Sequence, residues 1–152
     1  MDLRELYQEV IIDHNRNPRN HRAMEHATSE ALGFNPLCGD KLTVYLDISN
    51  GIIRDISFMG CGCAISQASA SLMTEALCGM TLEQAQEAFE RFHLMLTSDK
   101  EIPALGVDKL TVQCMALGYP FRPCVYSQHI KLLRKYVARI TGQHRNTSMN
   151  MT

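Results

Sequence analysis

The spacing of apolar residues along the chain changes from helical to alternating and then back to helical. In residues 3–14 the apolar positions recur every three or four residues, which predicts an amphipathic helix that ends before Pro18. Residues 19–40 contain several turn-forming residues and predict mainly loop. Residues 41–48 then alternate between apolar and polar positions, as expected of a strand with one buried face.

A β-hairpin is predicted around Asn50-Gly51, because both residues tolerate the positive φ angles of a tight turn. The returning strand is predicted over 52–58, and one of its faces carries Ile52, Ile56 and Phe58. Arg54 interrupts this apolar face. Because a hairpin of two strands is only marginally stable alone, a third strand is expected near residues 28–34.

Helical spacing returns after Gly62. One apolar stripe runs to Leu77, and Gly79 can end that helix in the left-handed region. Thr81 and Gln84 have the spacing of a capping box, which predicts the start of the next helix.

Two further helices are predicted at about 108–117 and 125–140. The tail 143–152 carries no pattern and is expected to be disordered, so residues 1–142 are expected to form a single domain. The order of helix, strands and helices predicts an α+β fold. In that fold, helices pack on one face of a small antiparallel sheet of about three strands.

Composition limits which binding partners and which cellular compartment are expected. The formal net charge of the 152 residues is −1, so nucleic acid is not an expected partner. MDLRELYQEV lacks the basic and apolar regions of a signal peptide, and no apolar run is long enough to cross a bilayer. We therefore expect a cytoplasmic protein without a membrane partner.

The chain contains six cysteines, which in a reducing compartment favours metal or thiol chemistry over disulfides. Only their even number favours a disulfide framework. Cys38 lies in a C-G-D turn, in which Gly39 lets its thiolate and the Asp40 carboxylate converge. Cys63 and Cys124 lie at the starts of predicted helices, where unpaired amides and the helix dipole favour a thiolate.

These three thiols and the Asp40 carboxylate make a candidate tetrahedral site, and three thiolates suit zinc or iron–sulfur chemistry. The gaps of 25 residues (38 to 63) and 61 residues (63 to 124) are not those of a zinc finger. The residues alone therefore leave ordinary buried cysteines as an equal alternative.

The remaining candidates have simpler interpretations. Cys61 and Cys63 could form a redox pair, which is a weaker hypothesis than a metal site. Cys78 and Cys114 lie at apolar helical positions and are expected to be small core residues. His14 is expected to make a structural hydrogen bond rather than to bind a metal.

Three segments, NPLCGD, GCGCAISQASASLMTEALCG and DHNRNPRN, resemble the IscU/SufU family of iron–sulfur cluster assembly proteins. The resemblance runs from about residue 3 to residue 140. Cys63 is similar to the family's second ligand cysteine, whereas Cys61 falls on a variable position. The long gap before Cys124, and Pro123 where IscU-type scaffolds have a histidine, resemble the SufU branch.

This resemblance implies a function and a set of site residues. Cys38, Asp40, Cys63 and Cys124 would hold zinc, and Cys38 would be the sulfur acceptor. The protein would relay persulfide sulfur from a cysteine desulfurase to a cluster-assembly complex, as a zinc-dependent sulfurtransferase. The sequence FRPCVYSQH departs from the Arg-x-Lys-Cys pattern of the branch, which leaves Cys114 as an alternative third ligand.

Two other functions use the same residues. The four ligands could instead hold a [2Fe–2S] cluster while it is assembled and transferred, as a scaffold does. A purely structural zinc module without sulfur chemistry is the third interpretation.

Overall fold

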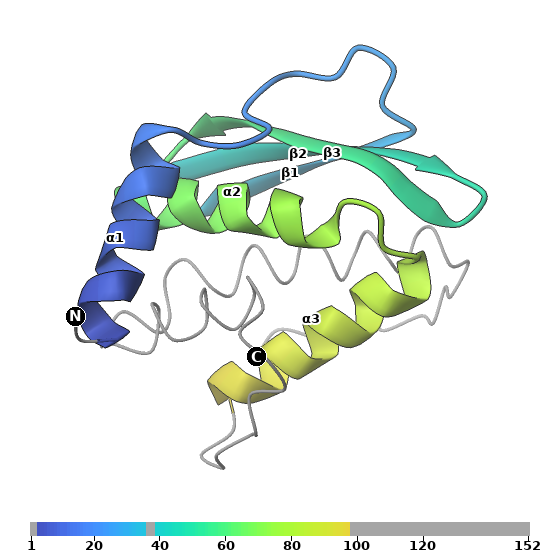
Figure 1. The fold of residues 1–152 in the computed structure, drawn as a ribbon. Coiled ribbons are helices and arrows are strands. Elements are labelled where there is room, and N and C mark those ends of the chain that lie inside the picture. Colours follow the sequence, from blue (N-terminus) through green and yellow to red (C-terminus); the bar gives the residue numbers. More distant parts are fainter. Residues whose placement is uncertain (1–2, 36–38, 98–152) are drawn as a thin grey trace, which may run out of the picture.

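The computed structural model describes residues 3–35 and 39–97 (Figure 1). Along the chain the elements are α1 (Leu3–Arg16), β1 (Ser29–Asn35), β2 (Asp40–Ser49), β3 (Ile52–Cys61), α2 (Ala64–Leu77) and α3 (Leu82–Thr97). Five of the six elements were predicted from the pattern, and β1 was expected because a hairpin of two strands is only marginally stable alone. The helices predicted at 108–117 and 125–140, and the tail from 143, lie outside the described residues.

The three strands form one antiparallel sheet in the order β1-β2-β3. The alternation predicted for β2 is confirmed, since Leu42, Val44 and Leu46 are each at most 3% exposed. Asn50 and Gly51 connect β2 to β3 with φ angles of 52° and 73°, a left-handed turn conformation that both residue types tolerate.

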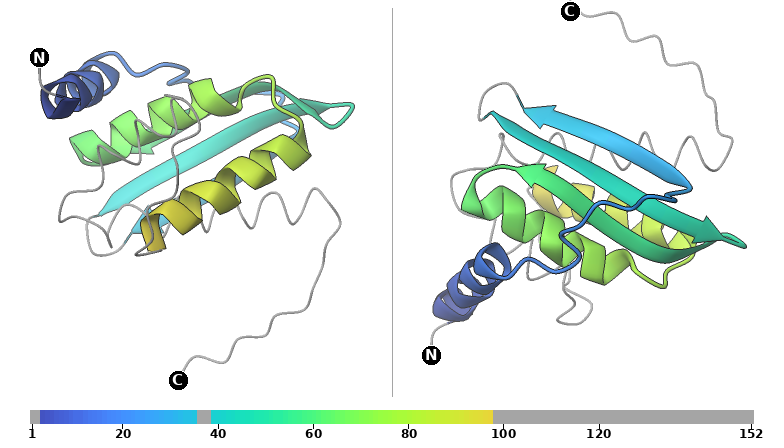
Figure 2. Two further views of the ribbon diagram at one scale, coloured as in Figure 1. Left: turned by 60° about the horizontal axis from the view of Figure 1, so that its bottom comes forward. Right: turned by 90° about the horizontal axis from the view of Figure 1, so that it is seen from above.

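The helices α2 and α3 lie on the same face of the sheet (Figure 2), which confirms the α+β arrangement. Ala85 and Phe89 of α3 join the buried cluster that β2, β3 and α2 form. The reciprocal hydrogen bonds of the predicted capping box are present, from Gln84 N–H to Thr81 Oγ1 and from Thr81 N–H to Gln84 Oε1. None of the three described helices combines the length and the apolar character that crossing a bilayer requires.

A β-bulge in β3 explains the charged residue that interrupts its apolar face. Asp47 pairs with Asp55 and Ile48 with Ile53, so Arg54 is the extra residue on β3. Arg54 is exposed, while Ile53 is only 3% exposed in the core. The core position predicted for Ile52 was therefore wrong by one residue, because strict alternation does not allow for a bulge.

Cys78 is exposed, so its predicted place in the core was also wrong. The helix α2 ends at Leu77, and Cys78 is its C-cap with an extended backbone (φ −60°, ψ 127°). Its side chain therefore leaves the buried stripe, and Sγ lies 3.7 Å from the carbonyl oxygen of Arg54. Gly79 follows at φ 85°, as predicted for the residue that ends the helix.

Candidate metal centre

The sheet places Asp40 and Cys63 next to each other although 23 residues separate them. Asp40 is the first residue of β2, and Lys41 pairs with Cys61 at the end of β3. Because β2 and β3 are antiparallel, the start of one and the end of the other meet at one end of the sheet. Cys63 follows two residues later as the N-cap of α2.

The Asp40 carboxylate is buried and only half satisfied. Its Oδ1 accepts a hydrogen bond of 3.1 Å from the backbone N–H of Cys63. Its Oδ2 has no hydrogen-bond partner within residues 3–35 and 39–97, although the side chain is only 6% exposed. A buried carboxylate oxygen without a partner is costly, which is the condition expected of a ligand atom that a cation would satisfy.

The Cys63 thiol is accessible at the N-terminus of α2. Its side chain is exposed, and Sγ accepts a hydrogen bond of 3.4 Å from the backbone N–H of Ser66 in the first turn of α2. The positive end of the helix dipole lies beside this bond. A thiolate and a carboxylate oxygen are both ordinary zinc ligands, so these two residues fit a zinc centre.

Two glycines lie where β2 closely approaches the segment that joins β3 to α2. A Cβ atom on Gly60 would lie 2.1 Å from the carbonyl oxygen of Lys41, and the residue has φ 141°. A Cβ atom on Gly62 would lie 3.1 Å from Oδ1 of Asp40. The approach of β2 therefore requires glycine at position 60, whereas at position 62 a side chain would press against the Asp40 and Ser66 side chains.

The other two predicted ligands, Cys38 and Cys124, lie outside the described residues, as does Cys114. Within the part of the chain that the structure describes, no group of three acidic, cysteine or histidine side chains could hold a metal ion. Cys61 is exposed at the end of β3, with Lys41 as its partner across the sheet. The structure therefore brings together two of the four predicted ligands, Asp40 and Cys63.

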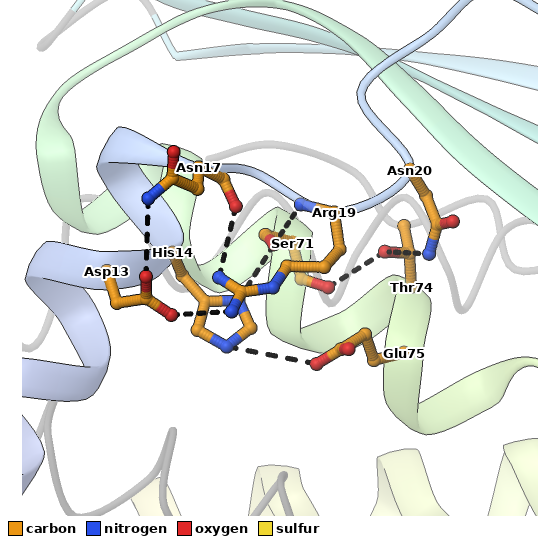
Figure 3. Close-up of polar contacts among 8 residues, drawn as sticks. All are labelled: Asp13, His14, Asn17, Arg19, Asn20, Ser71, Thr74 and Glu75. Atoms are coloured by element: carbon orange, nitrogen blue, oxygen red, sulfur yellow. Dashed lines mark hydrogen bonds and ion pairs between the residues drawn. The ribbon is translucent and has the colours of Figure 1, made fainter.

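A polar network fixes the DHNRNPRN segment onto α2 (Figure 3). His14 is only 6% exposed, and its Nδ1 lies 2.8 Å from Oγ of Ser71. The same Oγ accepts a hydrogen bond of 2.8 Å from the backbone N–H of Arg19, so its own hydrogen can point to His14. The other ring nitrogen, Nε2, lies 3.8 Å from Oε2 of Glu75. The expected structural hydrogen bond of His14 is confirmed.

The network extends from α1 to the sheet. Arg19 pairs with Asp13, and this hydrogen bond holds the pKa of the Asp13 carboxyl below its usual value. Asn20 donates to Thr74 Oγ1 of α2 at 3.1 Å, while its carbonyl accepts from the backbone N–H of Phe58 in β3 at 3.0 Å. Asn20 has φ 56°, a conformation that asparagine adopts more readily than most residues.

The sequence analysis did not predict the roles of the polar residues on α2. Ser66, Ser71 and Thr74 are each 0% exposed, although their side chains are polar. A signal was available, because these residues fall within the most buried helix and hydroxyl groups in such places need partners. His14 and Asn20, which bond to Ser71 and Thr74, could not be identified as their partners, because each lies more than fifty positions earlier in the chain.

The sequence of this chain is similar to those of known proteins. Residues 6–117 match the family model of the NifU-like N terminal domain. The zinc-dependent sulfurtransferase SufU of Bacillus subtilis is 31% identical over 141 residues, which cover 93% of this chain and 95% of that protein. The iron–sulfur cluster assembly scaffold protein IscU of Thermotoga maritima is 30% identical over 141 residues, 93% of this chain and 99% of that protein.

A solved structure agrees with these relatives. The crystal structure of FiSufU from Fervidobacterium islandicum AW-1 has a TM-score of 0.75 and 30% sequence identity to this chain. The match covers 86% of this chain and 96% of that one. The chain therefore belongs to the IscU/SufU family of NifU-like iron–sulfur cluster assembly proteins.

Proposed function

We propose that this protein is a zinc-bound sulfur acceptor, which receives persulfide sulfur from a cysteine desulfurase and delivers it to a cluster-assembly complex. In this proposal Asp40, Cys63, Cys38 and Cys124 hold the zinc, and Cys38 carries the sulfur. The observation that supports it most directly is the buried Asp40 carboxylate, whose Oδ2 lacks a partner beside the exposed thiol of Cys63. The 31% identity to SufU over nearly the whole chain supports the same choice.

When bound, zinc would keep its cysteine ligands deprotonated at neutral pH. The Cys38 thiolate attacks the terminal sulfur of a persulfide on the desulfurase. A new S–S bond forms at Cys38 while the S–S bond of the desulfurase breaks, and the desulfurase cysteine leaves as a thiolate. The exchange needs no external oxidant or reductant. The protein thus acts as a sulfurtransferase.

The exposure of the centre suits this transfer. Cys63 and the preceding turn are accessible at the end of the sheet. The Asp40 carboxylate is instead fixed by a hydrogen bond from the backbone N–H of the N-cap residue of α2. The only oxygen ligand in a set of thiolates binds zinc less strongly than a further thiolate would. Asp40 therefore keeps the ligands exchangeable while the fold keeps them in place.

A scaffold that builds a [2Fe–2S] cluster is the second candidate, because IscU of Thermotoga maritima matches the same share of the chain at 30% identity. Purification without oxygen, followed by metal analysis and a visible spectrum, distinguishes the two. We expect a colourless protein with one zinc ion per chain. A brown protein with iron and sulfide, absorbing in the visible range, would instead establish the scaffold.

Asp40→Asn should separate metal binding from folding. The zinc dissociation constant should rise more than about 100-fold, the upper end of what even an outer-sphere partner costs. The metal-free protein should gain about 1 kcal/mol in its free energy of unfolding, because an unpartnered amide costs less to bury than an unpartnered carboxylate. Chelator competition and urea unfolding measure the two quantities.

Asp47→Asn is the matched control, since Asp47 lies on the same strand and accepts from Thr28 Oγ1. It should leave the zinc affinity unchanged. Unaltered zinc affinity in Asp40→Asn would remove Asp40 from the ligand set.

A further inference from the structure

The backbone N–H of the N-cap residue of α2 finds its partner outside the helix. In a capping box, the side chain of the third helical residue returns to the backbone N–H of the N-cap residue. Here the N-cap is Cys63 and the third helical residue is Ser66. The N–H of Cys63 donates instead to Oδ1 of Asp40, which comes from β2. Asp40 thus takes the place that a Glu or Gln at the third helical position fills in a capping box.

The Ser66 hydroxyl, at that third helical position, is buried without a partner. Ser66 is 0% exposed, and its Oγ makes no hydrogen bond within residues 3–35 and 39–97. Ser71 and Thr74, which are equally buried on the same helix, both have partners for their hydroxyl groups. An unmade hydrogen bond in a buried place costs stability, so the site of Ser66 calls for an explanation that the other two do not.

The space around Gly62 shows which group the Ser66 hydroxyl lies near. A Cβ atom on Gly62 would lie 3.0 Å from Oγ of Ser66 and 3.1 Å from Cγ and Oδ1 of Asp40. The hydroxyl and the carboxylate therefore line the same small space beside the glycine. They do not hydrogen-bond to each other, since both Ser66 Oγ and Asp40 Oδ2 lack partners in the described part of the chain. Each therefore has bonding capacity that no described residue uses.

We propose that the Ser66 hydroxyl is a positioning residue of the centre and donates a hydrogen bond to an anionic sulfur held there. The inference rests on the proposed function. Chemistry divides the two roles: an ionised carboxylate can only accept, whereas the hydroxyl can donate. Three thiolates and one carboxylate around a divalent ion leave an excess charge of about −2, and a donor to one sulfur disperses part of that charge.

The test compares Ser66→Ala with Ser57→Ala. Ser57 on β3 is also 0% exposed with an unpartnered Oγ, so both variants delete the same kind of buried hydroxyl. Zinc affinity is measured by competition with a chromophoric chelator. Ser66→Ala should raise the zinc dissociation constant about 10-fold, the lower end of the range for outer-sphere partners, and Ser57→Ala should leave it unchanged. Neither variant should lower the urea midpoint of the metal-free protein.

Cobalt(II) provides a readout that a purely structural role would not change. With cobalt in place of zinc, loss of a hydrogen bond to a ligand sulfur should shift the sulfur-to-cobalt charge-transfer band of Ser66→Ala to longer wavelength. The spectrum of Ser57→Ala should match that of the unmodified protein. Equal zinc affinity and equal spectra in the two variants would overturn the role of Ser66 alone. An unmodified protein that binds no zinc would overturn the proposed function together with this inference.

Discussion

Replacing Gly60 by alanine should lower the free energy of unfolding by about 4 kcal/mol. Two costs combine in this value: the φ angle of 141° is strained for any residue with a Cβ atom, at roughly 1–3 kcal/mol. The added atom would also lie 2.1 Å from the carbonyl oxygen of Lys41 and 2.8 Å from Cα of Leu42, and such overpacking costs roughly 1–3 kcal/mol. Since both neighbours are backbone atoms, a change of side-chain rotamer cannot relieve the clash. Urea unfolding measures the loss.

Gly79→Ala is the control for Gly60→Ala. Gly79 also has a positive φ angle, 85°, but a Cβ atom there would meet nothing within 4 Å. This variant should lose only the conformational part, about 1 kcal/mol. Equal losses in the two variants would contradict the close approach of β2 and β3 beside the candidate metal centre.

Cys38→Ser should abolish the transfer of sulfur to this protein. Incubation with a cysteine desulfurase and cysteine should leave a persulfide on Cys38 of the unmodified protein, detected by mass spectrometry of the intact chain and its peptides. Serine should carry none, because only a thiolate attacks the terminal sulfur of a persulfide under these conditions. A serine variant that still carried sulfur would refute the assignment of Cys38 as acceptor.

Two exposed cysteines serve as controls for that experiment. Cys61 lies at the end of β3 near the centre, and Cys78 lies at the far end of α2. Cys61→Ser and Cys78→Ser should both accept sulfur as the unmodified protein does. Loss of transfer in Cys61→Ser would favour a thiol relay that uses Cys61 and Cys63.

The sequence pattern predicted every described element except β1, because those five depend on residues that are close in the chain. The alternation in β2 and the capping box of Thr81 and Gln84 are local signals, and both are present. The errors occurred where one residue changes the register. Arg54 forms a bulge that moves Ile53 into the core, and α2 ends one residue before Cys78. Neither change alters composition or average periodicity.

The site could be predicted only in part, because it depends on contacts between distant residues. The motif around Cys38 and Asp40 and the turn before Cys63 indicated ligand residues, and the structure brings Asp40 to Cys63. No pattern indicated that Asp40 would replace the usual cap of α2 and leave Ser66 without a partner. The other two predicted ligands, Cys38 and Cys124, stay predictions.

The network between the DHNRNPRN segment and α2 sets the order in which the chain can assemble during synthesis. His14, Arg19 and Asn20 find their partners 57, 52 and 54 residues later in the sequence. At roughly 5–20 residues per second, the ribosome adds those residues in about 3–11 seconds. A helix of 14 residues is marginal in water without packing, so α1 forms and unravels during that interval. The N-terminal helix therefore cannot reach its final packing until α2 has been made, although it is made first.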